Sequence, residues 1–483
     1  MEVTTLTTLF VTIVLIGNIV LAGVVVFIER RDIGSTWAWL MVLFFIPIVG
    51  FLVYLFLGRQ LKQKNFYQLS SEERSYLKST VDEQTHQLQN SSFYQRNLLT
   101  KHFDLLLMNL KSSNALLTMY NEIEIFSDGH DKFQSLFEEI KKAQEEIHLQ
   151  YYIIQGDSLG KRLRDELTKK AKEGVKVRVL YDDIGSKSIS PGFFKELIQY
   201  GGEVEVFFPS FLKLINFRIN NRNHRKLCII DRKIAYIGGF NIGNEYLGLD
   251  KKFGYWRDTH LKVRGESVNQ LQGRFLLDWN YAAKNKLNLV PYSVPVEKPE
   301  GDTPVQIIAS GPNSETEHIK NAYIKLITSA KKTVYIQTPY FVPDASFMDA
   351  CKIALLSGVD VSIMIPSKGD SPIVYWATMS YAGELIDYGA KIYLYEKGFI
   401  HAKTIVVDQE VASVGTANID TRSFRLNFEV NAVLYDEKAA TQLHSLFLQD
   451  CKDSSEYSIA RYKDRSILNK FKEAITRLLS PIL

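Results

Sequence analysis

The chain has 483 residues, of which 46% are hydrophobic and 23% are charged, and its formal net charge is +4. This composition excludes an intrinsically disordered protein, and the length predicts roughly two to four structural units. The three cysteines, Cys228, Cys351 and Cys451, are widely spaced and odd in number. They predict no disulfide framework and fit a body in a reducing compartment.

The N-terminal region contains two uncharged runs, Leu6–Ile28 and Thr36–Gly58. Each run is long enough to cross a hydrocarbon core of about 30 Å as a helix. A short polar segment separates them, so the sequence predicts a transmembrane hairpin over residues 1–59 with helices at about 6–28 and 36–58. A signal peptide is the alternative for the first run, but it lacks a basic start and a cleavage-site pattern, and a second run follows directly.

The orientation of this hairpin follows from its flanking charges. A hairpin places the start of the chain and everything after the second run on one side of the membrane. That side begins with Arg59, Lys62 and Lys64, whereas the loop contains Arg30 and Arg31. The positive-inside rule therefore favours a multi-pass cell-membrane protein with a cytoplasmic body.

The remaining chain has a duplicated organisation. Residues 60–118 are polar and helix-forming, and they predict a connector without site chemistry of its own. Helical and strand-like stretches then alternate over 119–286 and again over 305–483, on either side of a linker at 287–304 that is rich in Pro, Val and charge. The repeated order of strand and helix predicts two α/β sandwiches, each with a mostly parallel sheet.

Each repeat contains one polar motif. The first copy has His224 and Lys226, continues to Asp231, and is followed by Gly238-Gly239-Phe240-Asn241; the second has His401 and Lys403, continues to Asp408, and is followed by Gly415-Thr416-Ala417-Asn418. The offset between the two histidines is 177 residues (401 − 224), and the same offset relates the Lys, Asp, first Gly and Asn positions. Five matched positions in one register indicate a common site.

Local geometry explains this spacing. Residues i and i+2 of a strand point to the same face, so each histidine projects together with its lysine. Asp231-Arg232-Lys233 and Asp408-Gln409-Glu410 predict turns into a second strand. That strand ends in small residues and returns Asn241 or Asn418 towards the His/Lys pair, where a backbone without large side chains can approach a ligand.

Two histidines, two lysines and two asparagines around one point predict a phosphate-transfer site. Lys226 and Lys403 would neutralise the non-bridging oxygens, and Asn241 and Asn418 would donate hydrogen bonds to them. One imidazole can attack phosphorus while the other protonates the departing alkoxide. Because each copy holds half of these groups, the two halves must face each other.

Two simpler interpretations compete with this one. A single His-x-Lys would be an ordinary core or surface histidine, but two copies in register, each with its asparagine, argue against that. A zinc site would need further ligands, yet each histidine neighbours a lysine and no Cys or carboxylate lies at ligand spacing. The sequence therefore predicts neither a metal nor a cofactor.

The pattern H-x-K-x4-D with a trailing Gly-x-x-Asn resembles the phospholipase D superfamily from about Met119 onward, and the chain is similar within it to bacterial cardiolipin synthases. The resemblance implies two tandem phospholipase D-like α/β sandwich repeats with facing motifs, preceded by the two-helix transmembrane hairpin. The similar segments are the hairpin with Ile28-Glu29-Arg30-Arg31 and Leu57-Gly58-Arg59, Gly239–Tyr246, Ser310-Gly311-Pro312, Thr338–Pro343, Asn418–Phe424 and Leu479-Ser480-Pro481.

This resemblance implies a two-step transfer of a phosphatidyl group between two phosphatidylglycerol molecules. His224 would be the nucleophile that forms a phosphohistidine, and His401 the general acid and then base, although the nearly symmetric sequence leaves the two assignments open. Asp231 and Asp408 complete the catalytic motif, and we expect them to fix turns and neighbouring backbone.

Each imidazole also needs a carboxylate that orients it. Glu429 matches the acidic position of the family after the second motif, and Asp258 is the candidate for the first. The alternative for Asp258 is a salt bridge with Arg257 or another cation.

Several other functions share this core. The alternatives are a phospholipase D-type hydrolase and a phosphatidyltransferase with another acceptor alcohol. A nuclease is disfavoured by the membrane runs and by the lack of an extended basic tract, so no nucleic-acid partner is expected, and intact motifs disfavour a non-catalytic scaffold. The expected partners are phosphatidylglycerol and an anionic bilayer, while protein partners stay unknown.

One further segment stands out near the end of the chain. Ile467, Leu468, Phe471, Ile475, Leu478 and Leu479 fall on one helical face, surrounded by basic residues. This pattern predicts an amphipathic helix that docks on the body, with contact to the membrane as the alternative.

Overall fold

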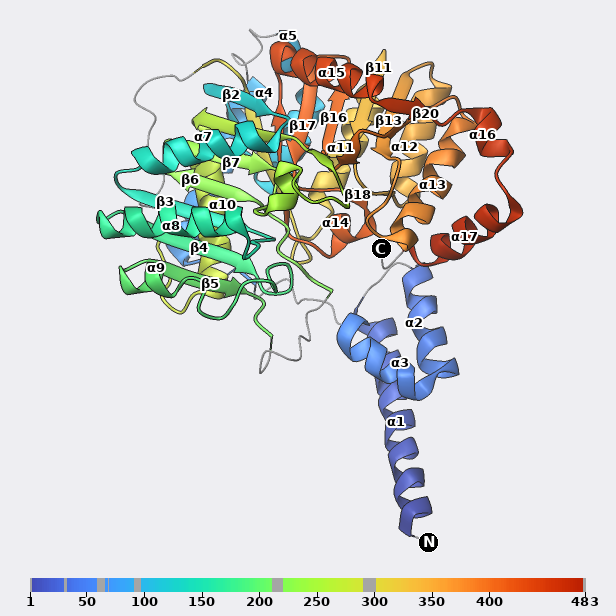
Figure 1. The fold of residues 1–483 in the computed structure, drawn as a ribbon. Helices are drawn as coiled ribbons and strands as arrows, with labels where there is room; N and C mark the ends of the chain where they lie inside the picture. The colour runs from blue at the N-terminus through green and yellow to red at the C-terminus, as the bar shows by residue number, and fades with distance from the viewer. Residues whose placement is uncertain are drawn as a thin grey trace.

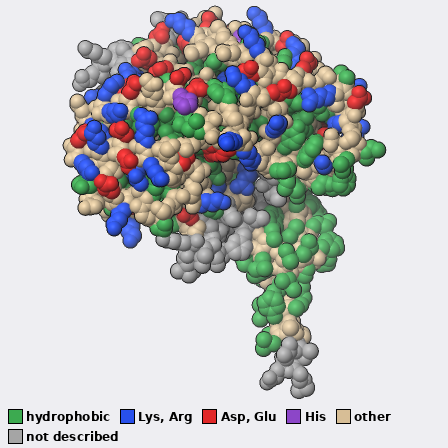
Figure 2. All heavy atoms as spheres, in the orientation of Figure 1, with side chains coloured by type: hydrophobic (Ala, Val, Ile, Leu, Met, Phe, Trp, Pro, Cys, Tyr) green, Lys and Arg blue, Asp and Glu red, His purple; other side chains and the backbone are tan. Residues whose placement is uncertain are grey.

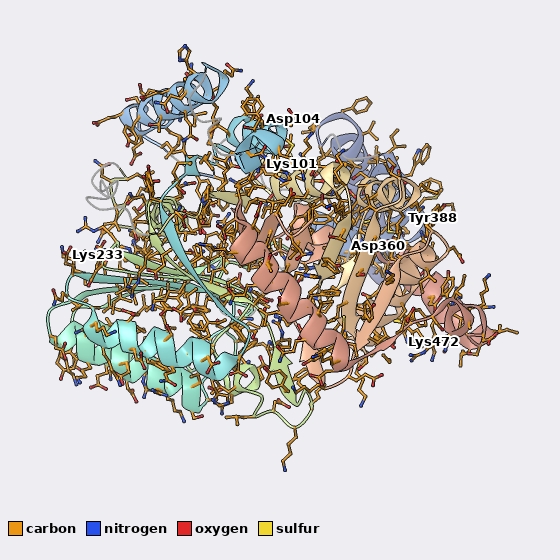
Figure 3. The ribbon with its side chains drawn as sticks, turned by 90° about the horizontal axis from the view of Figure 1, so that it is seen from above. Lys101, Asp104, Lys233, Asp360, Tyr388 and Lys472 are labelled. Atoms are coloured by element: carbon orange, nitrogen blue, oxygen red, sulfur yellow. The ribbon has the colours of Figure 1, made fainter. Side chains whose placement is uncertain are left out.

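The computed structural model describes residues 2–29, 33–58, 66–67, 69–90, 97–210, 220–289 and 301–480. Figure 1 shows two α/β halves side by side, with a helical stalk that leaves the body on one side. Figure 3 shows the same body from above, with Lys233 in the first half and Asp360 and Lys472 in the second. The predicted division into two repeats therefore corresponds to two sheets.

The first half is one mixed sheet covered by helices. Within the described residues its strand order is β2-β9-β7-β6-β3-β4-β5. Its elements are β2 (Asn121–Phe126), α7 (Gly129–Lys142), β3 (Glu146–Tyr151), α8 (Ser158–Lys172), β4 (Lys176–Asp182), α9 (Lys195–Gln199), β5 (Glu203–Phe207), β6 (Leu227–Ile230), β7 (Ile234–Gly238), the 3₁₀-helix η4 (Asn244–Leu247), β8 (Tyr255–Arg257), β9 (His260–Gly265) and α10 (Ser267–Ala282).

The second half repeats this plan. Its described sheet has the order β1-β10-β19-β17-β16-β11-β13-β14-β20. Its elements are β10 (Val305–Ser310), α11 (His318–Ser329), β11 (Thr333–Gln337), β12 (Phe341–Val342), α12 (Ala345–Leu356), β13 (Asp360–Pro366), α13 (Pro372–Ile386), β14 (Lys391–Tyr395), β15 (Gly398–Ile400), β16 (Thr404–Val407), β17 (Val411–Gly415), β18 (Ile419–Asp420), α14 (Thr421–Arg425), β19 (Glu429–Leu434), α15 (Glu437–Lys452), β20 (Ser454–Glu456), α16 (Ile459–Lys463) and α17 (Ile467–Leu478).

The repeated order of strand and helix follows from the apolar spacing. In α7, Phe133, Leu136, Phe137 and Ile140 are buried at intervals of one helical turn. The helix begins at Asp128, whose carboxylate accepts hydrogen bonds from the N–H groups of His130 and Asp131. The predicted helix and strand order is therefore confirmed for both halves.

The prediction of mostly parallel sheets is wrong. The pairs β3–β4 and β4–β5 are parallel, but β2–β9, β7–β9, β6–β7 and β3–β6 are antiparallel. The reason is that the motif strand β6 enters the sheet against β3 and continues into a hairpin with β7. The second half has the same arrangement around β16 and β17.

The two motif hairpins turn through left-handed residues. Asp231 and Arg232 have φ angles of 51° and 57°, and Asp408 and Gln409 have 52° and 56°. These angles, with hydrogen bonds from Lys233 to Ile230 and from Glu410 to Val407, mark tight three-residue turns between the paired positions Ile230 and Ile234 and Val407 and Val411. The predicted turns are confirmed.

Asp231 and Asp408 also tie the turns to the rest of their sheets. The Asp231 carboxylate accepts hydrogen bonds from the N–H groups of Gln144, Glu145 and Glu146 at 2.8 to 2.9 Å. The Asp408 carboxylate accepts three from residues 331–333 at 2.8 Å. These two motif carboxylates therefore fix backbone, as expected.

The two sheets share one apolar core. Leu227 and Ile229 of the first half and Val406 and Val414 of the second belong to the same buried cluster, together with residues of α10 and α15. Burial of apolar area on this scale is the main force that holds two such layers together. The direct contacts between the sheets join β17 and β19 of the second half to β7 and β9 of the first, so the second strands of the two motif hairpins lie against each other.

The connector is part of the second half. It contains α4 (Ser71–Asn90), α5 (Asn97–Lys101), α6 (Phe103–Ser113) and β1 (Leu117–Thr118). Leu105, Leu106 and Leu110 of α6 lie in the core of the second half, and β1 pairs with β10. The residues 290–300, most of the predicted linker, lie outside the described residues.

The stalk begins with one long apolar helix. Among the described helices, α1 (Glu2–Phe27) is the one long and apolar enough to cross a membrane, with a mean hydropathy of 2.8 over Thr5–Phe27. The N-terminus lies at the end of the stalk farthest from the body (Figure 1). Helix α1 therefore marks the chain as a membrane protein.

The second predicted membrane helix, 36–58, is not continuous. It divides into α2 (Ile33–Phe45), α3 (Pro47–Val53) and the π-helix η1 (Tyr54–Gly58). Pro47 lacks the N–H that would bond the Leu43 carbonyl, and the Asn18 side chain of α1 donates to this carbonyl at 3.0 Å instead. The carbonyl that the proline leaves without a helical hydrogen bond is therefore bonded by a side chain of the neighbouring helix.

The bent segment returns to the end of α1 that is nearer the body. The Tyr54 hydroxyl donates to the Glu29 carboxylate at 2.9 Å, whereas the break at Pro47 lies at the level of Asn18. The predicted two-span hairpin is thus only partly present. Arg30, Arg31, Arg59, Lys62 and Lys64, on which the predicted orientation depends, lie outside the described residues.

Candidate active site

The backbone N–H of each motif histidine donates a hydrogen bond to the backbone of the other half. The His224 N–H donates to the Phe428 carbonyl at 3.0 Å, beside an isolated bridge between Asn223 and Phe428. The His401 N–H donates to the Arg257 carbonyl at 2.7 Å, where β15 pairs with β8. The chain is extended here, and the regular strands begin only after each lysine.

The residue that follows each of these carbonyls is the orienting carboxylate. His224 Nδ1 lies 2.9 and 3.0 Å from the two Glu429 oxygens, and His401 Nδ1 lies 2.6 Å from Asp258 Oδ2. All four side chains are buried. Each histidine is therefore oriented by a carboxylate from the opposite repeat.

The protonation of these pairs follows from their surroundings. Burial opposes ionisation of Glu429 and Asp258, but the facing histidines and lysines lower the pKa of both carboxyl groups below its ordinary value. An ionised carboxylate can only accept, so Nδ1–H must donate. Burial lowers the pKa of His224 to about 4 and that of His401 to about 3. Each imidazole thus presents a free Nε2 lone pair.

Asp258 makes the contact that the sequence left undecided. Its alternative partner Arg257 instead bonds the Asp450 carboxylate, with Nε 2.9 Å from Oδ2. Gly239 makes room for it, because a Cβ at that position would lie 1.9 Å from Asp258 Oδ1. The small residues were predicted to let the backbone approach a ligand. Gly239 instead leaves space for the Asp258 carboxylate.

The matching position in the second repeat is Thr416. Its hydroxyl donates to Glu429 Oε2 at 2.5 Å, and the Ser423 hydroxyl donates to Oε1 at 2.9 Å. The longer Glu429 side chain is thus held by two hydroxyls that the first repeat does not supply. Sequence reasoning missed both hydroxyls, although Thr416 stands in the second motif.

Each motif lysine is buried and bonds the backbone of its own histidine. Lys226 Nζ donates to the His224 carbonyl at 2.6 Å and Lys403 Nζ to the His401 carbonyl at 2.5 Å. Burial lowers the pKa of Lys226 to about 7 and that of Lys403 to about 8. Lys403 lowers the pKa of His224, and Lys226 that of His401. These cross-effects place both motifs within one electrostatic centre.

The two asparagines differ. Asn241 is bonded within the protein: its oxygen accepts from the Ile153 N–H at 3.2 Å and its amide donates to the Tyr246 hydroxyl at 3.1 Å. Asn418 is also buried, but its oxygen has no hydrogen-bond partner among the described residues. Of the two, Asn418 therefore keeps an unused oxygen beside the motif of Lys403.

A charged network behind His224 was not predicted. Arg225 is fully buried, and its Nη1 donates to both oxygens of Asp278 at 2.5 and 2.6 Å. Its Nε bonds the Glu429 carbonyl at 3.1 Å. The Tyr67 hydroxyl donates to Asp278 at 2.5 Å. Arg225 lies between His224 and Lys226 in the first motif, and this position is the sequence signal that could have identified it as a residue of the site.

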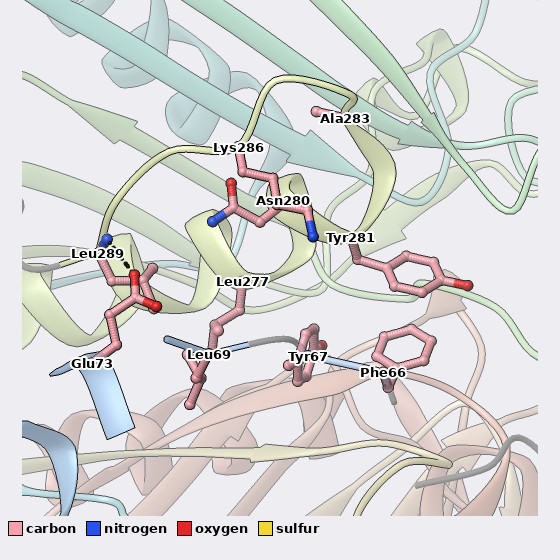
Figure 4. Close-up of a pocket in the computed structure, with 10 residues that line it drawn as sticks. All are labelled: Phe66, Tyr67, Leu69, Glu73, Leu277, Asn280, Tyr281, Ala283, Lys286 and Leu289. Carbon is pink, nitrogen blue, oxygen red and sulfur yellow. Dashed lines mark hydrogen bonds between the residues drawn. The ribbon is translucent and has the colours of Figure 1, made fainter. Parts of the chain in front are cut away.

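Tyr67 belongs to the segment that joins the anchor to the body. Phe66 stacks on Tyr281 and on Phe428, with ring centroids 3.9 and 4.8 Å apart. Figure 4 shows both residues beside a cavity of about 190 Å³ that Leu277 and Lys286 also line. The connector was expected to lack site chemistry. This part of it nevertheless contacts Phe428, the residue before Glu429.

Two neutral imidazoles with buried carboxylates and facing lysines define an enzyme that transfers a group at phosphorus. This arrangement supplies a nucleophile, a proton carrier and two cations around one point.

Comparison with known proteins gives the family. A family model described as "Cardiolipin synthase, PLD-like domain" matches residues 136–279 and 323–451, and one described as "Phospholipase_D-nuclease N-terminal" matches residues 16–59. The major cardiolipin synthase of Bacillus subtilis strain 168 is 53% identical over 96% of this chain and 97% of its own length. A cardiolipin synthase of Listeria welshimeri is 52% identical over 98% of both chains.

A solved structure supports the fold. The crystal structure of phosphatidylserine synthase from Haemophilus influenzae Rd KW20 matches with a TM-score of 0.61 over 80% of this chain and all of the other, at 16% identity. This chain belongs to the cardiolipin synthase family with phospholipase D-like domains.

The carboxylates provide the first test of the site. We expect Asp258→Asn and Glu429→Gln each to lower kcat by about 10²–10⁴-fold, because an amide can donate to Nδ1 and favour the wrong tautomer. Asp360→Asn, at an exposed carboxylate that begins β13 beside Thr333, is the matched control and should keep full activity. Near-normal kcat in either site variant, measured on phosphatidylglycerol vesicles, would contradict the orienting role.

The lysines provide a pH test. Lys226 and Lys403 lose their charge as pH rises through about 7 and about 8, so attraction for an anionic substrate falls on the basic side. We expect kcat/KM, which reports the free enzyme, to decline above about pH 7. In Lys226→Arg, whose cation persists, the decline should move towards the pKa of Lys403. A profile that stays flat to about pH 9 would show that neither lysine binds as a cation.

Proposed function

We propose that the chain makes cardiolipin by transferring a phosphatidyl group from one phosphatidylglycerol molecule to another, with release of glycerol. The main support is that each repeat supplies the carboxylate that orients the histidine of the other repeat. Both imidazoles are buried and can use Nε2 for chemistry. The relatives that share nearly the full length are themselves named cardiolipin synthases.

In the first step, Nε2 of His224 attacks phosphorus and the bond from phosphorus to the glycerol oxygen breaks. His401, in its protonated form, gives a proton to that oxygen, so glycerol leaves as the neutral alcohol. Lys226 and Lys403 balance the charge on the non-bridging oxygens. The bound phosphodiester anion raises the pKa of the nearby imidazoles above its value in the free protein, which lets His401 hold this proton.

In the second step, His401 takes the proton from a hydroxyl of the second phosphatidylglycerol. That oxygen attacks phosphorus and the bond between phosphorus and His224 breaks, which regenerates the free imidazole. The assignment of His224 as nucleophile rests on family analogy, because the two histidine environments are nearly equivalent. Asn418 and Asn241 are proposed to contact the bound phosphate or acceptor, and the unpaired Asn418 oxygen can accept a hydrogen bond from the acceptor hydroxyl.

Transfer instead of hydrolysis is supported by the surroundings of the histidines. His224 and His401 are 8% and 7% exposed, and aromatic rings lie against them, Tyr152 at 4.9 Å and Trp256 at 5.2 Å between ring centroids. Such walls limit water and suit a lipid. Attachment to the bilayer also raises the local concentration of the acceptor.

The reaction is tested with purified full-length protein and labelled phosphatidylglycerol in vesicles. We expect cardiolipin and free glycerol in equal amounts, and His224→Ala and His401→Ala should each lose at least about 10³-fold of the rate, because neither half can act alone. Phosphatidate as the main product would instead indicate hydrolysis. Substantial turnover by either variant would refute the shared centre.

We further propose how the anchor sits in the cell membrane. Helix α1 spans the bilayer, and α2 with α3 enters and leaves on the side of the body, since Tyr54 bonds Glu29. In the sequence, Arg30 and Arg31 follow Glu29 and Arg59 follows Gly58, so basic residues flank the ends of the anchor on the side of the body. The positive-inside rule makes that side cytoplasmic. The two-span, multi-pass hairpin is the alternative.

Cysteine labelling separates the two topologies. In a background with Cys451→Ser, which leaves only buried cysteines, Glu2→Cys should react with a membrane-impermeant maleimide on intact cells. Lys233→Cys, on an exposed turn of the body, should react only after permeabilisation. If Glu2→Cys is also protected in intact cells, both ends lie inside and the two-span hairpin is correct.

A further inference from the structure

The helix α17 is docked on the body by its polar side. Glu473 and Thr476 are its buried residues, and the Glu473 carboxylate accepts from Arg465 Nε at 2.8 Å. Arg477 pairs with Glu384 of α13 at 2.6 Å, and Lys472 lies over the Trp376 ring at 4.9 Å. The contacts that hold this helix are therefore ionic and cation–π contacts.

Its apolar side faces outward. Ile467 is 87% exposed, Leu478 is 76% exposed and Phe471 is 61% exposed, and Leu468 and Ile475 on the same face are exposed as well. The predicted docking on the body is present, since α17 packs on α13, but the polar side makes the contact and the apolar residues stay uncovered. A contiguous apolar stripe of this kind marks a binding surface.

The helix lies on the side of the body from which the anchor leaves. Figure 1 shows α17 along the lower edge of the second half, level with the upper end of α2. Figure 2 shows hydrophobic side chains on this lower edge next to those of the stalk. Because α1 fixes where the bilayer lies, a surface at this level faces the bilayer. The exposed stripe therefore continues the apolar surface of the anchor.

The charges around the stripe fit an anionic membrane surface. Lys470 in α17 and Arg461 and Lys463 in α16 are exposed, together with one acidic residue, Asp464, at the end of α16. No acidic residue occurs on the exposed face of α17, because Glu473 is turned inward. An amphipathic helix with a broad apolar face and flanking lysines and arginines is the type that lies in the interface of a bilayer.

We propose that α17 lies in the bilayer interface, with its apolar face among the lipids, as a second attachment of the catalytic body. Helix α17 packs against α13, so its attachment positions the second half of the body relative to the bilayer. Helix α13 begins two residues after Asp370, which bonds the Tyr340 hydroxyl at 2.5 Å and contributes to the potential at Lys403. Attachment of α17 therefore sets the distance and tilt of the catalytic centre relative to its lipid substrate.

A site-specific probe tests this placement in the full chain. With Cys451→Ser, an environment-sensitive nitrobenzoxadiazole label is placed at Phe471→Cys, and the protein is reconstituted in nanodiscs of phosphatidylglycerol and phosphatidylcholine. The matched control is Leu356→Cys, an equally prominent exposed apolar residue at the end of α12. Leu356 lies just before β13, whose first residue pairs with Thr333, at the opposite end of the sheet from the segment with His401.

We expect the label at position 471 to shift to shorter emission wavelengths and to be quenched by lipids with brominated acyl chains, and the label at position 356 to do neither. A water-like emission at position 471 would overturn the proposal. So would efficient disulfide cross-linking between two unlabelled chains that carry Phe471→Cys, because the face would then be covered by a second copy.

A kinetic experiment separates membrane attachment from damage to the site. The double variant Phe471→Glu with Ile475→Glu should raise the KM for phosphatidylglycerol in vesicles by about tenfold with little change in kcat. Its activity on detergent-dispersed short-chain phosphatidylglycerol should equal that of the unchanged protein. The control Leu356→Glu should match the unchanged protein in both assays. An equal loss in vesicles and detergent would indicate disturbed folding and refute the interfacial role.

Discussion

The hydrogen bond between each imidazole and a carboxylate of the opposite repeat is the constraint on which the rest of this structure depends. It requires the segment that bears each histidine to meet the carboxylate-bearing segment of the other half within hydrogen-bonding distance, and the shared apolar core between the sheets holds the two halves in that position. It also explains why four ionisable groups can be buried together. Each carboxylate accepts a hydrogen bond from a neutral imidazole and is stabilised by a nearby lysine, and each remaining oxygen accepts from a hydroxyl or a backbone N–H.

The same constraint accounts for the differences between the repeats. The short Asp258 reaches His401 because Gly239 leaves its path open, whereas the longer Glu429 needs the hydroxyls of Thr416 and Ser423. Arg225 adds a further link, since it bonds the backbone of the strand that bears Glu429 and is neutralised by Asp278. The segment with Phe66 and Tyr67 then connects this network to the chain that leaves the membrane.

Much of this arrangement could be predicted from the sequence, because the duplication repeats its polar residues with a fixed offset. The two histidines, the two lysines and the turns at Asp231 and Asp408 were identified in this way, whereas Glu429 was identified from the family resemblance. Asp258 was less certain because the offset fails there: Glu429 follows it by 171 residues (429 − 258) and not by 177. The difference is an insertion between Asn241 and Asp258, which no register argument could align.

Other features depend on tertiary contacts that a linear pattern does not contain. The uncharged run 36–58 has the composition of a membrane helix, but Pro47 breaks it and Asn18 satisfies the freed carbonyl. The apolar face of α17 has a core-like periodicity, and only the ionic partners on α13 and beside it reveal that the helix is turned outward. The parallel character of the sheets was overestimated because the motif hairpins run against their neighbours.

The crossing of carboxylates between the repeats has a consequence for how such a protein could arise. A single repeat would hold a histidine and a lysine, but its own carboxylate would be placed to orient the histidine of a second molecule and not its own. A half-length ancestor could therefore work only as a symmetric pair of identical subunits. Fusion of the two subunits into one chain would remove that symmetry requirement, and each copy could then change its glycine, hydroxyl and carboxylate independently of the other.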